Sequence, residues 1–484
     1  MTRAANRADP AGSMPALEGG RASPEVGAAA AFVAALALAF FAAEVVSIVG
    51  APPKLTAAIP AVGALLTSCG LGIALTSGTL PDFLGSVVGR APRALALAFA
   101  GGALAWALGL AGEAWLALAA GLGVLANSQF AGPLAADGAL SDGLAARFPH
   151  APLRAAFALA LFAIGALTAM AGAMIAQAAA GASFGLPPIA IDVALTITLI
   201  LSASPGGARG ALWLDAMVGA LFVFGALALA GWSLVRPGAA PVGLAPLASD
   251  WAHMLQSSFA SPLGLIALVA ALAGFAPLAQ ALGGARRDGA AKSGYWAFLF
   301  LAVALAALSL EREAVEQASG GLKAVDDAFT LLAGLGLARA GTLVAARAFG
   351  SSGTRSGAVN LASLRLARLR LGTLGLAALF VALARHAGQT PAALTQAALE
   401  LSLALIVPAL ALSRLERAGA LSIGAALCVG VAMVALPGRL PTSLADLSLK
   451  LAGEAALAAF SAGLVVALLF PRDENSMDWD DASA

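Results

Sequence analysis

Charged residues are scarce in this sequence. Asp, Glu, Lys and Arg make up only 11% of the 484 residues, while hydrophobic residues make up 60% and the mean hydropathy is +0.91. This composition excludes a soluble multidomain enzyme, since soluble domains carry about 25% charged residues. The net charge of +1 leaves no basic surface for nucleic acid and no acidic tail for a basic partner. The composition suits a lipid bilayer as the solvent.

Cysteine and histidine are scarce as well. The two cysteines, Cys69 and Cys428, lie far apart in separate apolar stretches, which excludes a disulfide framework. None of the 3 histidines has a second histidine or a carboxylate at metal-ligand spacing. We therefore expect no metal site, no cofactor and no enzymatic activity. We also expect no ATP-driven transport within this chain, because no Gly-x-x-x-x-Gly-Lys-Ser/Thr motif occurs.

Long apolar runs recur along the chain. Each holds about twenty residues, enough to cross roughly 30 Å of hydrocarbon, and we predict an all-α integral membrane protein of about fourteen transmembrane helices. The predicted spans are 28–49, 56–79, 93–112, 114–133, 153–181, 187–203, 210–235, 262–283, 293–310, 327–349, 364–385, 392–413, 419–437 and 451–470. Residues 1–26 are polar and aperiodic, which predicts a disordered tail, and residues 471–484 form a second tail.

Basic residues fall mainly in alternate loops of this topology. Most of the 27 lie on the side of the N-terminus, which predicts that both termini are cytoplasmic. Arg347 and the set Arg365, Arg368 and Arg370 belong to that side, and we expect the set to contact anionic headgroups. The Ala-, Gly- and Arg-rich composition favours a bacterial cytoplasmic (inner) membrane.

Several short segments occur in an order that points to one family. They are residues 79–83, ending in Asp82-Phe83; 145–148, ending in Arg147-Phe148; Ala176-Gln177; 205–215, ending in Trp213-Leu214-Asp215; 274–277, from Gly274-Phe275 to Pro277, followed by Arg286-Arg287 and Tyr295-Trp296; and 408–414 with Ala418-Gly419-Ala420 and Gly424. Together they resemble the sodium/solute symporter family, in particular its cation/acetate symporter branch. The resemblance covers roughly residues 80 to 440. Leu214 stands where that family usually has Thr, and Val218 where it commonly has Gln.

The resemblance implies a core of two inverted five-helix repeats. The repeats would be residues 93–236 and 262–413, preceded by two additional helices in 27–92 and followed by two in 419–470. Solute and ion bind such folds at broken helices near the bilayer midplane. The expected breaks are Gly101-Gly102 in the third span and Gly274, Phe275 and Pro277 in the eighth, because glycine frees the backbone and proline removes a donor.

The tenth span departs from the family. Sodium-coupled members carry a pair of hydroxyl side chains there, and the matching positions of this chain are Leu337 and Ala338, followed by Arg339 and then Thr342. Leucine and alanine offer no oxygen to a hard cation, so the usual sodium site is expected to be missing. Arg339 lies about twelve residues from each end of its span, where a guanidinium needs a buried partner.

Three explanations of Arg339 stay open at this point. It replaces sodium by pairing with Asp215, which leaves transport uncoupled or proton-coupled; it binds the carboxylate of an anionic solute; or it forms a structural ion pair. Other polar residues within the predicted spans are functional candidates by the same rule. They are Glu44, Gln177, Asp192, Gln280, Gln396, Glu400 and Glu454.

The sequence therefore predicts a secondary transporter that moves a small solute by alternating access. The resemblance implies a short-chain monocarboxylate such as acetate, with a proton or sodium as the coupling ion. One alternative is a degenerate, non-transporting relative that acts as a partner subunit or sensor. A lipid-linked sugar flippase is a weaker alternative, because such proteins line their cavity with several basic residues.

Overall fold

The computed structural model describes residues 24–85, 88–108, 114–135, 140–148, 150–235, 269–282, 287–309, 320–350, 359–415, 417–435 and 449–470. Within those ranges every regular element is a helix and no strand occurs. The predicted tail 471–484 lies outside the described residues, and so does the tail 1–26 apart from its last residues, which begin the first helix.

A helix covers most of each predicted span. In the N-terminal half the long helices are α1 (Pro24–Ile48), α2 (Pro53–Ala74), α4 (Arg90–Ala107), α5 (Ala114–Phe130), α8 (Ala151–Phe184), α9 (Pro188–Ala203) and α10 (Gly207–Val235), and the short helices are α3 (Leu80–Phe83), α6 (Gly132–Ala135) and α7 (Leu140–Arg147). In the C-terminal half they are α13 (Ala276–Leu282), α14 (Arg287–Ser309), α16 (Gly320–Gly350), α17 (Val359–His386), α18 (Pro391–Leu401), the π-helical turn η1 (Ser402–Ile406), α19 (Val407–Leu412), α20 (Ala420–Ala435) and α21 (Leu449–Leu469). Proline begins several of them, where its missing N–H costs nothing.

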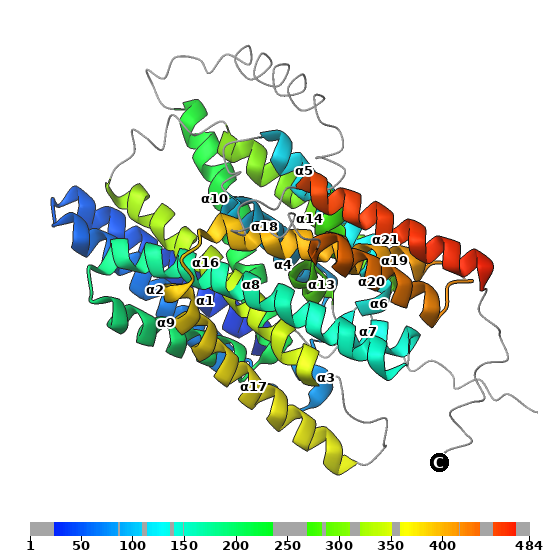
Figure 1. Ribbon diagram of the computed structural model, residues 1–484. Helices are drawn as coiled ribbons and strands as arrows, with labels where there is room; N and C mark the ends of the chain where they lie inside the picture. Colours follow the sequence, from blue (N-terminus) through cyan, green and yellow to red (C-terminus); the bar gives the residue numbers. More distant parts are fainter. Residues whose placement is uncertain are drawn as a thin grey trace, which may run out of the picture.

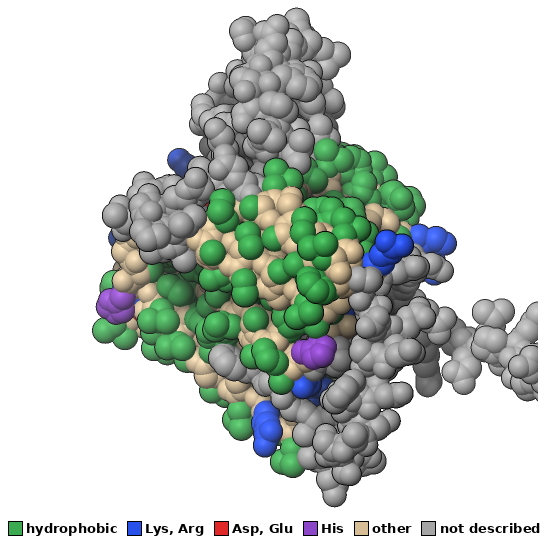
Figure 2. Space-filling view, turned by 45° about the vertical axis from the view of Figure 1, so that its right-hand side comes forward, with side chains coloured by type: hydrophobic (Ala, Val, Ile, Leu, Met, Phe, Trp, Pro, Cys, Tyr) green, Lys and Arg blue, Asp and Glu red, His purple; other side chains and the backbone are tan. Residues whose placement is uncertain are grey.

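Several helices meet the length and hydropathy of membrane spans. In the described residues there are 7 of these: Glu25–Ile48, Pro53–Ala74, Ala151–Phe184, Gly207–Ala228, Lys323–Ala348, Ser363–His386 and Pro391–Leu412. Large hydrophobic side chains project outward from them; Leu38 and Phe41, for example, are 68% and 67% exposed. Figure 2 shows one face of the molecule, whose described surface is mainly hydrophobic and carries few Lys or Arg side chains. This is the surface of an integral membrane protein.

Burial separates a central group of helices from a peripheral one. In the most apolar stretch of α16, 83% of the residues are buried, and in the stretch from α18 to α19 the share is 78%. In α1 only 22% of the residues in this stretch are buried. In Figure 1 the blue α1 and α2 and the red α21 lie on opposite flanks, with α4, α8, α13 and α16 between them. α16 is the most deeply buried of these helices and therefore lies at the centre of the bundle.

Glycines allow α8 and α16 to cross in direct backbone contact. A Cβ on Gly172 would lie 2.3 Å from the backbone N of Ala338, and one on Gly341 would lie 2.5 Å from the backbone N of Ala169. Gly165 and Gly334 are packed against backbone atoms of the opposite helix in the same way. Small residues at this spacing are typical of close helix pairs in membranes, and they fix the position of Arg339 on α16.

Candidate functional site

The second predicted break is present. The helix that contains Gly274 stops at Phe275, and α13 begins with Ala276. The fully buried amide of Asn127 on α5 donates to the carbonyl oxygens of Leu272 at 3.1 Å, Ala273 at 2.8 Å and Phe275 at 3.3 Å. The carbonyls of Leu272 and Phe275 also accept backbone N–H groups, whereas the carbonyl of Ala273 is four residues before Pro277, which has no N–H. Because a carbonyl inside a membrane has no water to bond, the Asn127 side chain satisfies the one that the break frees.

The first predicted break is wrong for the described part of its helix. Gly101 and Gly102 lie inside α4, which is helical without interruption from Arg90 to Ala107. Gly101 serves packing instead, because a Cβ there would lie 2.8 Å from Val124 Cγ2 and 2.9 Å from Leu301 Cδ2. The pair lacks what accompanies the break at Phe275, namely a following proline and a side-chain amide bonded to the freed carbonyls.

Arg339 on α16 forms an ion pair with Asp215 on α10. Its Nη2 donates to Asp215 Oδ1, and the two side chains are 2% and 13% exposed. The pair is thus buried within the bundle, as a guanidinium in a membrane interior requires. Gly336, one turn before Arg339, makes room for the ring of Phe99, because a Cβ on it would lie 2.5 Å from Phe99 Cε1. The expected partner of Arg339 is therefore confirmed.

A small cavity adjoins this pair, between α4, α10, α13 and α16. Its volume is about 20 Å³, which is room for a water molecule or two. The polar side chains in its lining are the acid Asp215 and the amide Gln280. The other lining residues are apolar or glycine: Ala96, Phe99, Ala100, Ala103, Ala208, Ala211, Leu212, Pro277, Ala281, Gly336, Leu337, Ala340 and Leu343. A solute of several heavy atoms fits there only if the helices move apart.

The structure brings some of the predicted site residues together and separates others. Asp215, Pro277 and Leu337 line the cavity, and Arg339 reaches it through Asp215. Ala338 is buried outside the cavity lining, and the hydroxyl of Thr342 donates to the carbonyl of Ala338 at 2.7 Å within the helix. The residues of the two predicted breaks are not part of the lining and contact other helices instead: Gly101, Gly102, Gly274 and Phe275.

Arg347 is a second buried cation that we assigned to the cytoplasmic surface. It is only 3% exposed, and its Nη1 donates to Gln280 Oε1 at 2.7 Å. Its Nη2 lies 3.4 Å from the carbonyl oxygen of Phe83. Arg347 thus joins α16 to the cavity wall and to the short helix α3. Its place near a helix end concealed this role, since basic residues there usually face water.

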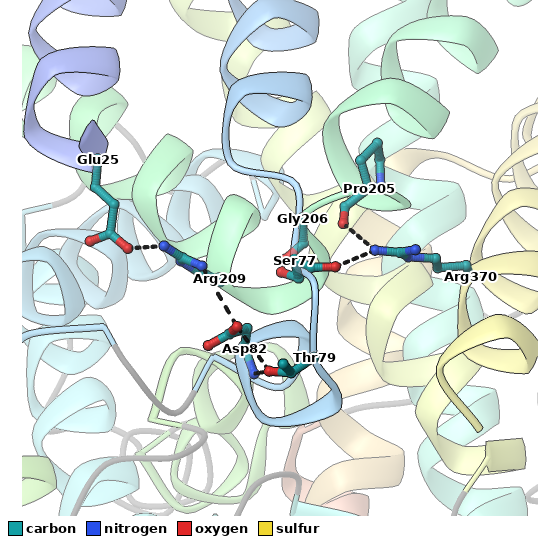
Figure 3. A network of polar contacts seen from close by, with 8 residues as sticks. All are labelled: Glu25, Ser77, Thr79, Asp82, Pro205, Gly206, Arg209 and Arg370. Carbon is teal, nitrogen blue, oxygen red and sulfur yellow. Dashed lines mark hydrogen bonds and ion pairs between the residues drawn. The ribbon is translucent and has the colours of Figure 1, made fainter. Parts of the chain in front are cut away.

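A further polar network joins two of the family-like segments (Figure 3). Ser77 donates its backbone N–H to the carbonyl of Pro205 at 3.0 Å and its hydroxyl to that of Gly206 at 2.9 Å. Arg370 donates to the carbonyls of Ser77 and Pro205, so the expectation that it contacts headgroups is wrong. Gly207 must be glycine here, because its φ is +55° and a Cβ would lie 2.5 Å from Phe83.

Charged groups complete that network. Arg209 pairs with Glu25 at the start of α1, and its Nη1 lies 4.0 Å from Asp82 Oδ2. Asp82 accepts from the hydroxyl of Thr79 at 2.8 Å, and Thr79 caps α3 by accepting from the Asp82 N–H. The network therefore holds α1, the segment before α4 and the start of α10 together at one end of the bundle.

Comparison with known proteins places the fold. No protein-family model and no curated protein sequence matches the chain. A solved structure does match, described as the substrate-bound outward-open state of a Na⁺-coupled sialic acid symporter with a novel Na⁺ site. The two share 15% identity, the match covers 88% of this chain and 99% of that chain, and the TM-score is 0.62. The fold of this chain is therefore that of a membrane transporter, and the assignment to the acetate branch stays a prediction.

Proposed function

We propose that the protein is a secondary transporter in which the Arg339 guanidinium, paired with Asp215, stands in place of a bound sodium ion. The observation that carries this proposal is the buried ion pair beside a cavity in a chain with a symporter fold. The core that moves would be the two predicted repeats, 93–236 and 262–413.

The local chemistry supports a fixed cation at this position. Leu337 and Ala338 present no side-chain oxygen, and the hydroxyl of Thr342 is bonded within its own helix. A hard cation such as Na⁺ needs several oxygen ligands. A guanidinium carries the same single charge and cannot leave the site, so it neutralises Asp215 permanently. This replacement of the ion by a side chain predicts transport that does not require sodium.

The solute class is proposed from two sources. The sequence resemblance implies a short-chain monocarboxylate such as acetate, and the matched structure is that of a sialic acid symporter. Both compounds carry a carboxylate. Arg339 Nε is buried and has no hydrogen-bond partner among the described residues, so the guanidinium keeps one donor for such a group when the cavity opens.

The test is uptake of radiolabelled acetate and of radiolabelled sialic acid into proteoliposomes, with sodium and proton gradients imposed separately. We expect uptake that does not depend on sodium and that falls by about tenfold or more in Arg339→Ala, because Asp215 then lacks its counter-charge inside the bundle. Arg368→Ala is the matched control, because Arg368 is exposed on α17. A triple variant, Leu337→Ser, Ala338→Thr and Arg339→Ala, should make uptake depend on sodium.

Each result separates the possibilities. Sodium-driven uptake by the unaltered protein would overturn the replacement of sodium by Arg339. If the unaltered protein is folded but takes up neither acetate nor sialic acid, the result would favour the alternative of a non-transporting partner subunit.

A further inference from the structure

Glu400 is a buried carboxyl group that the proposed site does not use. It lies near the end of α18, is 0% exposed, and is the one ionisable residue of that helix. Its Oε1 accepts from Gln396 Nε2 at 2.9 Å, one turn earlier. Its Oε2 is buried and has no hydrogen-bond partner among the described residues. The carboxyl group therefore has a neutral amide as its described partner.

The helices packed against α18 bring no described cation to Glu400. They are α8, α4, α21 and the turn η1. Arg154 of α8 and Arg90 of α4 are exposed in the first turns of their helices, while Arg93 of α4 donates to the carbonyls of Val88 at 2.7 Å and Gly85 at 2.6 Å. Lys450 and Glu454 of α21 have side chains outside the described set.

This environment favours the neutral form of Glu400. A carboxylate taken out of water without a counter-charge is strongly destabilised, and the group binds a proton instead. Asp215 is the opposite case in the same bundle, because Arg339 supplies its counter-charge. The two buried acids thus differ in what balances them: a guanidinium for Asp215 and a proton for Glu400.

Glu400 is also tied to the broken helix. The π-helical turn η1 begins two residues after it, and Ser402 Oγ lies 3.4 Å from the carbonyl oxygen of Ala271, which it can bond. Val407, directly after the turn, fills the space beside Gly274, where a Cβ would lie 2.6 Å from Val407 Cγ2. A π-turn interrupts regular helix bonding and is frequent at functional sites. A change of charge at Glu400 thus acts on a segment that is seated against the break.

We propose that Glu400 is a proton-binding site whose protonation keeps the π-helical turn seated against the break at Phe275, and that this proton drives transport. The role of this proton as the driving ion rests on the proposed function, whereas the binding of a proton by Glu400 does not. The neutral acid stays in the apolar bundle. Loss of the proton leaves a carboxylate that must reach water, and it draws η1 away from residues 271–274.

Proton binding can be measured without any solute. Dicyclohexylcarbodiimide modifies protonated carboxyl groups in apolar surroundings, and peptide mass spectrometry locates the adduct in the purified full-length protein. We expect Glu400 to be modified at neutral pH and Asp215 to remain unmodified. In parallel, infrared difference spectra between acid and alkaline pH should contain a protonated-carboxyl band that Glu400→Gln removes and Glu454→Gln leaves in place. Spectra in which Glu400→Gln removes no band would overturn the proposal, whether or not the reagent reaches Glu400.

The link to the break has its own readout. The protection of residues 269–282 from hydrogen exchange, taken relative to the intrinsic exchange rate at each pH, should increase when the pH is lowered in the unaltered protein, and this increase should be absent in Glu400→Gln, which mimics the neutral acid. An identical pH response in the variant would overturn the link. If Glu400 titrates but neither acetate nor sialic acid is transported, the proton site stands and the proposed solute transport fails.

Discussion

The glycine pair of α4 and the segment Gly274-Phe275 of the opposite half were expected to be equivalent, yet only the second interrupts its helix. Gly101 and Gly102 are surrounded by side-chain ends and keep their helical bonds. At Phe275 the amide of Asn127 binds three carbonyls and Pro277 supplies no N–H. A membrane helix breaks where another group satisfies its backbone, and glycine alone is not sufficient.

The largest effect is expected from removing that group. Asn127→Leu keeps a side chain of similar size but removes the donor described for the carbonyl of Ala273, while the carbonyls of Leu272 and Phe275 keep backbone N–H partners. Each buried carbonyl left unsatisfied costs about 1–3 kcal/mol. We expect a clearly lower midpoint of thermal unfolding in detergent. Ser128→Ala is the control, because the Ser128 hydroxyl donates within its own helix to Leu125 at 2.7 Å; equal midpoints for the two variants would mean that Asn127 does not hold the break.

A smaller contrast is expected between two alanine substitutions. A Cβ at Gly274 would lie 2.6 Å from Val407 Cγ2 and 3.1 Å from Ser402 Oγ, so Gly274→Ala should destabilise the protein by about 1–3 kcal/mol through overpacking. At Gly102 the nearest atoms, on Leu301 and Phe222, are 3.6 Å away, and Gly102→Ala should be neutral or stabilising by up to about 1 kcal/mol. Thermal unfolding of both variants measures the difference, and a Gly102→Ala protein as unstable as Gly274→Ala would contradict it.

The smallest effect is expected at the proline. Pro277 is in the first turn of α13, where its missing N–H costs little, so Pro277→Ala should change stability by less than about 1 kcal/mol. Hydrogen exchange of residues 276–282 reports whether the helix becomes continuous across Phe275. In the double variant with Asn127→Leu, the new N–H should recover part of the loss. A single Pro277→Ala variant that closes the break would show that proline, rather than Asn127, creates it.

The sequence was informative where apolar length alone decides the outcome. The predicted spans follow from runs of about twenty apolar residues, and a helix lies within each of them, although among the described residues 7 helices have the length and hydropathy of a membrane span. The Arg339 and Asp215 pair was predictable too, because a midplane guanidinium requires an acid and few acids are within the core. Such predictions need no knowledge of how side chains pack.

Other parts of the site depend on packing and were missed. Asn127 is an amide within an apolar span, which was the available signal, but only the tertiary structure places it against Phe275. Arg347 and Arg370 were assigned to the membrane surface from their position near helix ends, whereas both bind backbone or side-chain oxygens inside the protein. Charge counts along a sequence cannot distinguish a surface arginine from one that bonds a neighbouring loop.

The glycine crossing of α8 and α16 offers a stationary reference for observing movement. Two helices whose backbones touch at Gly172 and Gly341 have no room to slide or separate without losing every contact along the crossing. A pair of spin labels, one on each of these helices, should give a single narrow distance distribution under all conditions. Distances from that pair to labels on α1, α13 or α17 then report which parts of the bundle travel when pH or solute changes.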